Sequence, residues 1–192
     1  MNMTRRDLLQ NVAILLGGSI VGGSVFSISG CKSTDKQVNA LFNERQVALM
    51  NEIADTILPE TSSPGAKAAN VGNFMALMVL DCYAEADQKI FQDGLKKIDE
   101  LSDKQFNKSF VNADPKQRTE LLTALDKEQK EYQAKKGKDD PSHYFRMMKE
   151  LTVLGYFSSK EGATMALRYL PVPGKYDGSF PYKKGDKAWA TS

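Results

Sequence analysis

The side chains that most often carry nucleophilic or acid–base chemistry are scarce in this chain. It has one histidine, His143, and two cysteines, Cys31 and Cys82. A Ser/His/Asp triad would need His143 as its general base, but no nucleophile-elbow sequence accompanies it. A single histidine with no cysteine nearby also cannot build a histidine-rich metal site. We therefore interpret His143, which precedes a predicted helix, as a surface or helix-capping residue.

Two pairs of carboxylates have spacings that could support acid–base chemistry, Asp55 with Glu60 and Asp81 with Glu85. The second pair is four residues apart, which places both side chains on one face of a helix. Paired carboxylates can divide the roles of acid and base, but a helical chain with 24 acidic residues will contain such pairs without any function. The chain also lacks the glycine fingerprint of dinucleotide binding, the Walker loop and the Cys-x-x-Cys-His haem motif. We predict no catalytic residue, no cofactor-binding residue and no metal ligand.

Length and composition limit the class of protein to which this chain can belong. The chain has 192 residues, which is enough for one domain or for one domain and a tail. Its 41% apolar and 26% charged residues are close to globular averages and exclude wholesale disorder. Its 26 basic and 24 acidic residues are interleaved, so the net charge of +2 gives no reason to expect a nucleic-acid surface.

The first thirty residues have the layout of an export signal. Arg5 and Arg6 form a basic start, and an apolar stretch over 12–28 leads to the small residues Ser29 and Gly30. The consecutive arginines, followed by a polar and two apolar residues, resemble the twin-arginine export motif. An uncleaved transmembrane helix is the alternative, but polar residues open the apolar stretch and glycines dilute it. We predict a signal peptide over 1–30.

Cys31 follows Ile28, Ser29 and Gly30, and this sequence resembles a lipobox, at which a diacylglyceryl group is attached and the chain is cleaved before the cysteine. Two or more acyl chains hold a protein stably on a membrane. We therefore predict a lipid anchor at Cys31 and a protein on the periplasmic side of a membrane. Two alternatives are an ordinary thiol beside a signal-peptidase site and a disulfide with Cys82. Without that disulfide, Cys82 is interpreted as a small core residue.

After a polar tether over 31–41, the apolar spacing predicts a helical domain over 42–167. The first helix begins after Asn43 and ends before Pro59, and a nearly all-round apolar helix near 73–84 is expected to be the central buried one. A third helix begins near Asp87. Cap–proline pairs at 114–115 and 140–141 predict the starts of two more, and a short helix is expected over 160–167. The predicted fold is an all-α single bundle of five or six helices.

The last segment, 168–192, is predicted to be an irregular arm. Its first fifteen residues contain three prolines, two glycines and four aromatic residues, which excludes a regular helix. Such an arm could wrap across its own bundle or dock its aromatic residues on a partner. With a turn-rich loop between the first two helices, it supplies the candidate partner interface: Pro64, Gly65, Tyr169, Pro173, Gly174, Tyr176, Asp177, Phe180 and Tyr182.

Several motifs, in the same order along the chain, resemble the gluconate 2-dehydrogenase subunit 3 family. The segments that carry the resemblance are Ile53–Thr61, Ser63–Lys67, Asp81–Tyr83, Glu150–Thr152, Gly155–Phe157 and Pro173–Gly178. The resemblance extends over nearly the whole chain after the export signal. One departure is Ser179, because many relatives have a cysteine after the Tyr-Asp-Gly motif; a disulfide made by that cysteine would be missing here.

The resemblance implies a role that composition alone does not. It implies the small subunit of a periplasmic, membrane-associated sugar or polyol dehydrogenase whose large subunit is a glucose–methanol–choline flavoprotein. FAD would be held by that large subunit, and a cytochrome c with haem c often accepts the electrons. The small subunit would bind, co-export and tether the flavoprotein without a redox centre of its own. The alternatives are a stand-alone lipid-anchored binding protein and a subunit that contributes directly to dehydrogenase catalysis.

Overall fold

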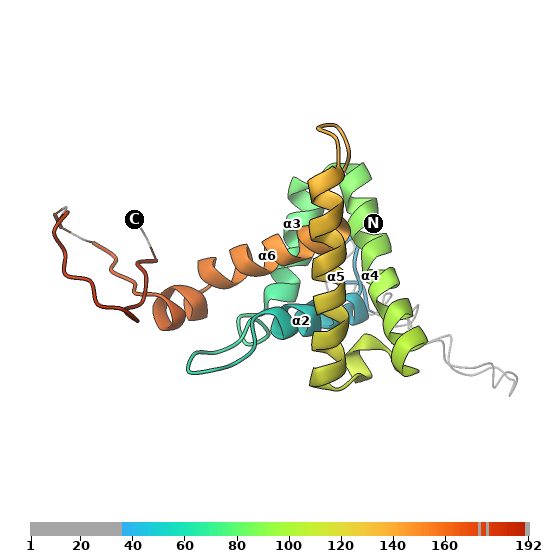
Figure 1. The fold of residues 1–192 in the computed structure, drawn as a ribbon, viewed down its shortest axis with the longest axis horizontal. Coiled ribbons are helices and arrows are strands. Elements are labelled where there is room, and N and C mark those ends of the chain that lie inside the picture. Colours follow the sequence, from blue (N-terminus) through green and yellow to red (C-terminus); the bar gives the residue numbers. More distant parts are fainter. Residues whose placement is uncertain (1–35, 173, 176, 191–192) are drawn as a thin grey trace, which may run out of the picture. The chain divides into compact units, whose positions relative to one another are not determined.

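The computed structural model describes residues 36–172, 174–175 and 177–190, all of which fall within the unit Asp35–Ser192. These residues form helices and irregular segments, with no β-sheet among them, which confirms the all-α prediction (Figure 1). No helix in this part of the chain is both long and apolar enough to cross a membrane. The elements are α2 (Glu44–Ile57), α3 (Val71–Cys82), α4 (Glu85–Phe106), the 3-10 helix η1 (Phe110–Asn112), α5 (Pro115–Lys135), α6 (Tyr144–Ser158) and the π-helical turn η2 (Gly162–Ala166).

Two helix starts are set by reciprocal capping, as their sequences predict. The Asn43 side chain accepts a hydrogen bond from the Gln46 N–H at 2.9 Å, and the Gln46 side chain accepts one from the Asn43 N–H at 3.0 Å. Asp114 and Gln117 make the same pair of bonds at the start of α5, at 2.9 and 3.1 Å. Each capping box satisfies two backbone donors that the first turn of a helix leaves unpaired.

The predicted start of α6 at the pair Asp140–Pro141 is wrong. The Asp140 carboxylate accepts a hydrogen bond from the Gly137 N–H at 2.7 Å, so it closes the loop after α5 and does not cap a helix. His143 caps α6 instead, because its Nδ1 accepts a hydrogen bond from the Phe145 N–H at 3.2 Å. Its side chain is only 8% exposed, and this burial lowers the pKa of His143, which favours the neutral form that can accept the bond.

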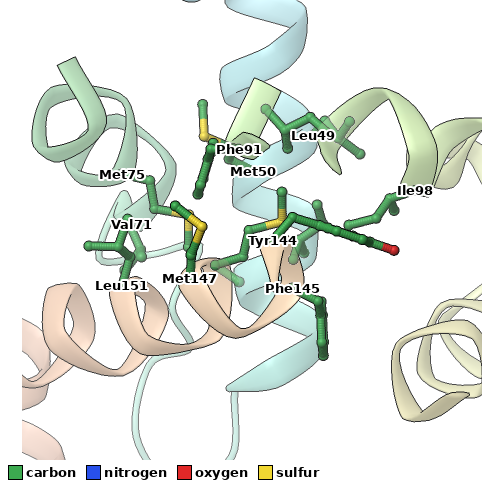
Figure 2. Close-up of a cluster of buried hydrophobic side chains, with 14 of the residues drawn as sticks. Leu49, Met50, Val71, Met75, Phe91, Ile98, Tyr144, Phe145, Met147 and Leu151 are labelled. Atoms are coloured by element: carbon green, nitrogen blue, oxygen red, sulfur yellow. The ribbon is translucent and has the colours of Figure 1, made fainter. Parts of the chain in front are cut away.

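The centre of the bundle is formed by α2 and α6, each of which packs against all the other α-helices from α2 to α6. Figure 2 shows their side chains meeting those of α3 and α4, including Met50, Met75, Phe91 and Leu151. The prediction that α3 is the central buried helix is wrong. Its apolar residues surround the helix, but its neighbours cover only one side, and Leu77 on the other side is 55% exposed.

Cys82 is a free, exposed cysteine, so its interpretation as a small core residue is also wrong. It is the last residue of α3 and lies outside the cluster of buried apolar side chains. The alternative disulfide with Cys31 concerns a residue outside the described part of the chain.

The residues that lead into α2 are attached to two other helices. The side chain of Asn39 donates to the Ala76 carbonyl of α3 at 2.9 Å, and Gln92 of α4 donates to the Leu41 carbonyl at 2.9 Å. Phe42 follows with a fully buried ring that packs edge-to-face on Phe91, with ring centroids 6.0 Å apart. The end of the segment predicted as a tether is therefore bound to the domain.

Asp126 links α5 to α6 through two ammonium groups. It lies 2.7 Å from Lys130 on its own helix and 2.6 Å from Lys149 on α6. The hydrogen bonds from these lysines lower the pKa of Asp126 from 3.8 to about 2. The ion pairs thus favour the charged carboxylate in the folded chain.

We expect the Asp126→Asn variant to be less stable than the parent protein by about 1 kcal/mol at neutral pH, because ion pairs whose lysines are open to solvent contribute little. Folding lowers the pKa of Asp126, so its ion pairs contribute fully to the free energy of unfolding above the unfolded pKa of this carboxyl group. That contribution is lost as the pH falls from about 4 to about 2. Urea unfolding at pH 7 and near pH 2 measures both values. Glu131→Gln, at an exposed position of the same helix, is the control. A difference between variant and parent that stayed constant with pH would contradict this assignment.

Candidate partner interface

The loop between α2 and α3 is attached to α6 through a motif tyrosine. The Tyr156 hydroxyl donates to the Pro64 carbonyl at 2.6 Å. Gly65 is buried, and a Cβ placed on it would lie 2.7 Å from both the Asp55 carboxylate and the Glu60 nitrogen. Gly65 therefore offers no surface to a partner; its lack of a side chain allows the loop to pack closely on the end of α2.

Glu52 forms the centre of an ion cluster that the sequence analysis missed. Its carboxylate pairs with Arg118 of α5 and with Lys67 of the loop. Arg118 also donates to the Ala113 carbonyl at 2.9 Å and lies over the Phe110 ring. Burial alone would raise the pKa of Glu52, but the two cations lower it below its ordinary value. A carboxylate held ionised between two cations joins elements of the fold and is poorly suited to act as a general base near neutral pH.

The described residues contain no group of three or more His, Cys, Asp or Glu side chains placed to hold a metal ion. The two carboxylate pairs that the sequence suggested form no acid–base site. Asp55 accepts a hydrogen bond from the Lys67 N–H at 3.4 Å, and Asp81 and Glu85 lie on the surface.

An open groove of about 500 Å³ runs between α2, α4 and η1. The carboxylate that lines it, Asp99, accepts a hydrogen bond from the Phe110 N–H at 2.8 Å.

Hydrogen bonds join the two ends of the C-terminal arm, so that the arm forms a loop. Arg168 donates its N–H to the Ala188 carbonyl at 2.8 Å, and its carbonyl accepts from the Ala190 N–H at 2.9 Å. The Arg168 guanidinium lies 4.2 Å from the centre of the Trp189 ring and 5.4 Å from that of Phe180. Figure 1 shows the arm leaving η2 and returning toward its own start. We call the described residues of this segment, 168–172, 174–175 and 177–190, the closed arm.

The closed arm exposes much of its apolar surface. Val172 is 79% exposed and Tyr182 is 74% exposed; Tyr169, Leu170, Phe180 and Trp189 are also exposed. An aromatic side chain buries about 150–250 Å² when it is fully covered. Because the four rings are between 40% and 74% exposed, they could bury about 400 Å² on a partner. This is roughly half of what one protein buries in an interface of standard size.

The structure places the predicted site residues in two groups. Tyr169, Gly174, Asp177, Phe180 and Tyr182 lie on the closed arm, and all five are exposed. Pro64 and Gly65 lie in the separate loop against α6. The remaining predicted positions lie outside the described residues: Arg5, Arg6, Gly30, Cys31, Pro173 and Tyr176.

A second apolar surface, which the sequence analysis missed, lies on the outer face of α6. Val153, Leu154 and Phe157 are exposed there, with Leu154 at 51%, and we call these three residues the α6 stripe. One to two turns earlier on the same face, Arg146 and Glu150 form an ion pair at 2.8 Å. The outer face of α6 therefore changes from charged to apolar along its length. The spacing of 150, 153, 154 and 157 is visible in the sequence, but spacing alone does not show whether this face of the helix is covered by a neighbour.

Comparison with known proteins identifies the family. The searches of curated proteins and of solved structures each found no match. The family model for gluconate 2-dehydrogenase subunit 3 matches residues 44–174, which span the helices from α2 to η2 and the start of the closed arm. The match confirms the resemblance seen in the sequence motifs, and a family defined as a subunit of a dehydrogenase implies a dehydrogenase partner. The chain belongs to the gluconate 2-dehydrogenase subunit 3 family.

Proposed function

We propose that this chain is a non-catalytic small subunit that binds the large subunit of a sugar or polyol dehydrogenase. The large subunit would be a flavoprotein of the glucose–methanol–choline type, and a cytochrome c would accept its electrons. FAD and substrate would both be bound by the large subunit. The small subunit would accompany it through twin-arginine export and tether it to a membrane by lipid at Cys31.

The exposed apolar surface is the observation that carries the binding role. The domain buries one cluster of apolar side chains in its core, but the α6 stripe and the closed arm still expose apolar side chains. Apolar surface grouped in this way is typical of a protein–protein contact. Family membership supports a dehydrogenase as the protein that covers it.

Co-purification tests the binding role. The full chain is expressed together with a glucose–methanol–choline dehydrogenase subunit encoded beside it, and each is purified through a tag on the other. We expect one complex that carries the flavin absorbance and the masses of both chains. Failure of the two chains to associate would favour the alternative of a stand-alone binding protein. Dye reduction by the small subunit alone, in the presence of sugars, would instead assign catalysis to this chain.

The export role predicts that Arg5→Lys combined with Arg6→Lys leaves both proteins in the cytoplasm. The large subunit would be retained because it is exported as a folded complex with the small subunit. Fractionation followed by immunoblotting of both chains measures this, with Arg146→Lys at an exposed position of α6 as the control. Export of the large subunit despite the double substitution would rule out joint transport.

The tethering role predicts that Cys31→Ser releases the small subunit from the membrane fraction, because the acyl chains then have no thiol to modify. Cys82→Ser is the matched control, since Cys82 is the other cysteine and is a free, exposed thiol. Ultracentrifugation of membranes with detection of both variants measures the effect. Equal amounts of the two variants in the membrane pellet would contradict lipid anchoring at Cys31.

A further inference from the structure

The C-terminal segment carries an uneven share of the positive charge. The whole chain has a net charge of +2, whereas residues 168–192 contain five basic and two acidic side chains. The basic ones are Arg168, Lys175, Lys183, Lys184 and Lys187, and the acidic ones are Asp177 and Asp186. A near-neutral protein thus ends in a cationic, aromatic segment.

Both acidic side chains of the closed arm are used to form its turns. Asp177 accepts a hydrogen bond from the Ser179 N–H at 3.0 Å, and Asp186 accepts one from the Lys183 N–H at 2.9 Å. In the second turn Gly185 has φ +97°, a conformation that residues with a side chain rarely adopt. This turn places Lys183 and Lys184 on the surface, directly after the exposed ring of Tyr182.

Two of the basic side chains are used in contacts within the chain: Arg168 holds the closed arm together, and Lys187 attaches it to η2. The Arg168 guanidinium interacts with the rings of Phe180 and Trp189, and the Lys187 ammonium donates to the Met165 carbonyl of η2. The other three basic side chains, those of Lys175, Lys183 and Lys184, are exposed. The closed arm therefore exposes both aromatic and cationic side chains.

We propose that the closed arm is a preformed docking loop that seats in an apolar groove with an acidic rim on the dehydrogenase large subunit. This inference rests on the proposed function, which supplies the partner. The charge of the arm argues for an acidic rim on that partner, and it argues against a second copy of this chain, whose arm carries the same sign. Because the arm is already closed by its own contacts, less conformational freedom is lost when it binds.

The test measures the affinity of full-length small-subunit variants for the purified flavin-containing large subunit. Lys183→Glu with Lys184→Glu is expected to weaken binding at least tenfold at about 0.05 M salt, and much less at about 0.5 M, where charges are screened. Tyr182→Ala is expected to weaken binding about tenfold at both salt concentrations, because apolar contact is not screened. Lys116→Glu with Lys127→Glu, at exposed positions of α5, is the matched charge control and should change affinity less than twofold.

The outcomes separate this inference from the function on which it rests. If the parent chain does not bind the large subunit, the proposed function fails and the docking loop fails with it. If the parent chain binds and the arm variants bind equally well, only the docking loop is overturned. Circular dichroism of each variant confirms that the helices are intact.

The other possible occupants are tested with Trp189, the one tryptophan of the chain. Its emission is recorded with vesicles of phosphatidylcholine and phosphatidylglycerol, and then over a range of protein concentrations. No change is expected in either titration. If the emission shifts to shorter wavelength with vesicles, and Lys183→Glu with Lys184→Glu removes the shift, the arm binds a membrane. The same result over the range of protein concentrations would assign the arm to a second copy of this chain. Either result would overturn the proposal.

Discussion

Replacing Leu154 and Phe157 with glutamine is expected to weaken binding of the dehydrogenase large subunit about tenfold to 100-fold. Covering one fully exposed side chain of this kind contributes about 1.5–3 kcal/mol. Because about half or more of each side chain is already covered in the subunit alone, the two together contribute about 1.3–2.6 kcal/mol, and about 1.4 kcal/mol corresponds to a factor of ten. Both side chains are exposed in the subunit alone, at 51% and 37%, so the helical domain should fold as before. Glutamine is a good helix former and is uncharged, which avoids an unfavourable charge near the C-terminal end of α6.

Arg146→Gln with Glu150→Gln is the matched control for this pair. It introduces the same side chain twice on the same outer face of α6, but at charged positions nearer the start of the helix. Isothermal titration of each variant with the large subunit measures the change. Equal affinities for the two double variants would show that the partner binds elsewhere and that the α6 stripe is exposed for another reason.

The Phe91→Ala substitution is expected to lower the free energy of unfolding by about 3–5 kcal/mol, the usual range for removing a buried phenylalanine. Phe91 of α4 is fully buried (Figure 2), and it packs edge-to-face on Phe42, which precedes α2. The substitution leaves a cavity between these two elements and removes the aromatic contact. Because domains have a total stability of about 5–15 kcal/mol, this single change removes a large part of it.

Leu77→Ala is the control for the core substitution, because Leu77 is apolar and lies on a helix but is 55% exposed. Its effect should stay within about 0.5 kcal/mol, as for most surface substitutions. Denaturant unfolding of both variants gives the comparison. A loss below 1 kcal/mol for Phe91→Ala would mean that the surrounding helices close the cavity.

The parts of the fold that the sequence predicts well depend on residues close together in the chain. Asn43 with Gln46 and Asp114 with Gln117 are three residues apart, and a capping box needs nothing beyond that spacing. The start of α6 was mispredicted because a competing contact was equally local: the Asp140 carboxylate turns back to the Gly137 N–H. A cap residue before a proline thus marks a helix start only if its side chain is not already engaged.

The candidate site was predictable in composition but not in arrangement. Prolines, glycines and aromatic residues predicted an irregular arm, and its described aromatic residues are indeed exposed. The contact between Arg168 and Trp189 joins residues at opposite ends of that arm. The ion pair between Glu52 and Arg118 crosses 66 positions of the chain. No local spacing indicates either contact, because each depends on where the intervening helices lead the chain.

The sequence by itself determined the family, the all-helical class and the ends of the well-capped helices, since motifs and capping interactions are local. Only the tertiary structure decided which apolar residues are buried. Leu151 and Leu154 lie one turn apart on α6, yet Leu151 packs in the core and Leu154 is exposed. On α3, Val79 is buried and Leu77, two residues earlier and on the opposite side of the helix, is exposed. Burial depends on which side of a helix its neighbours cover, and that is decided only when the helices pack together.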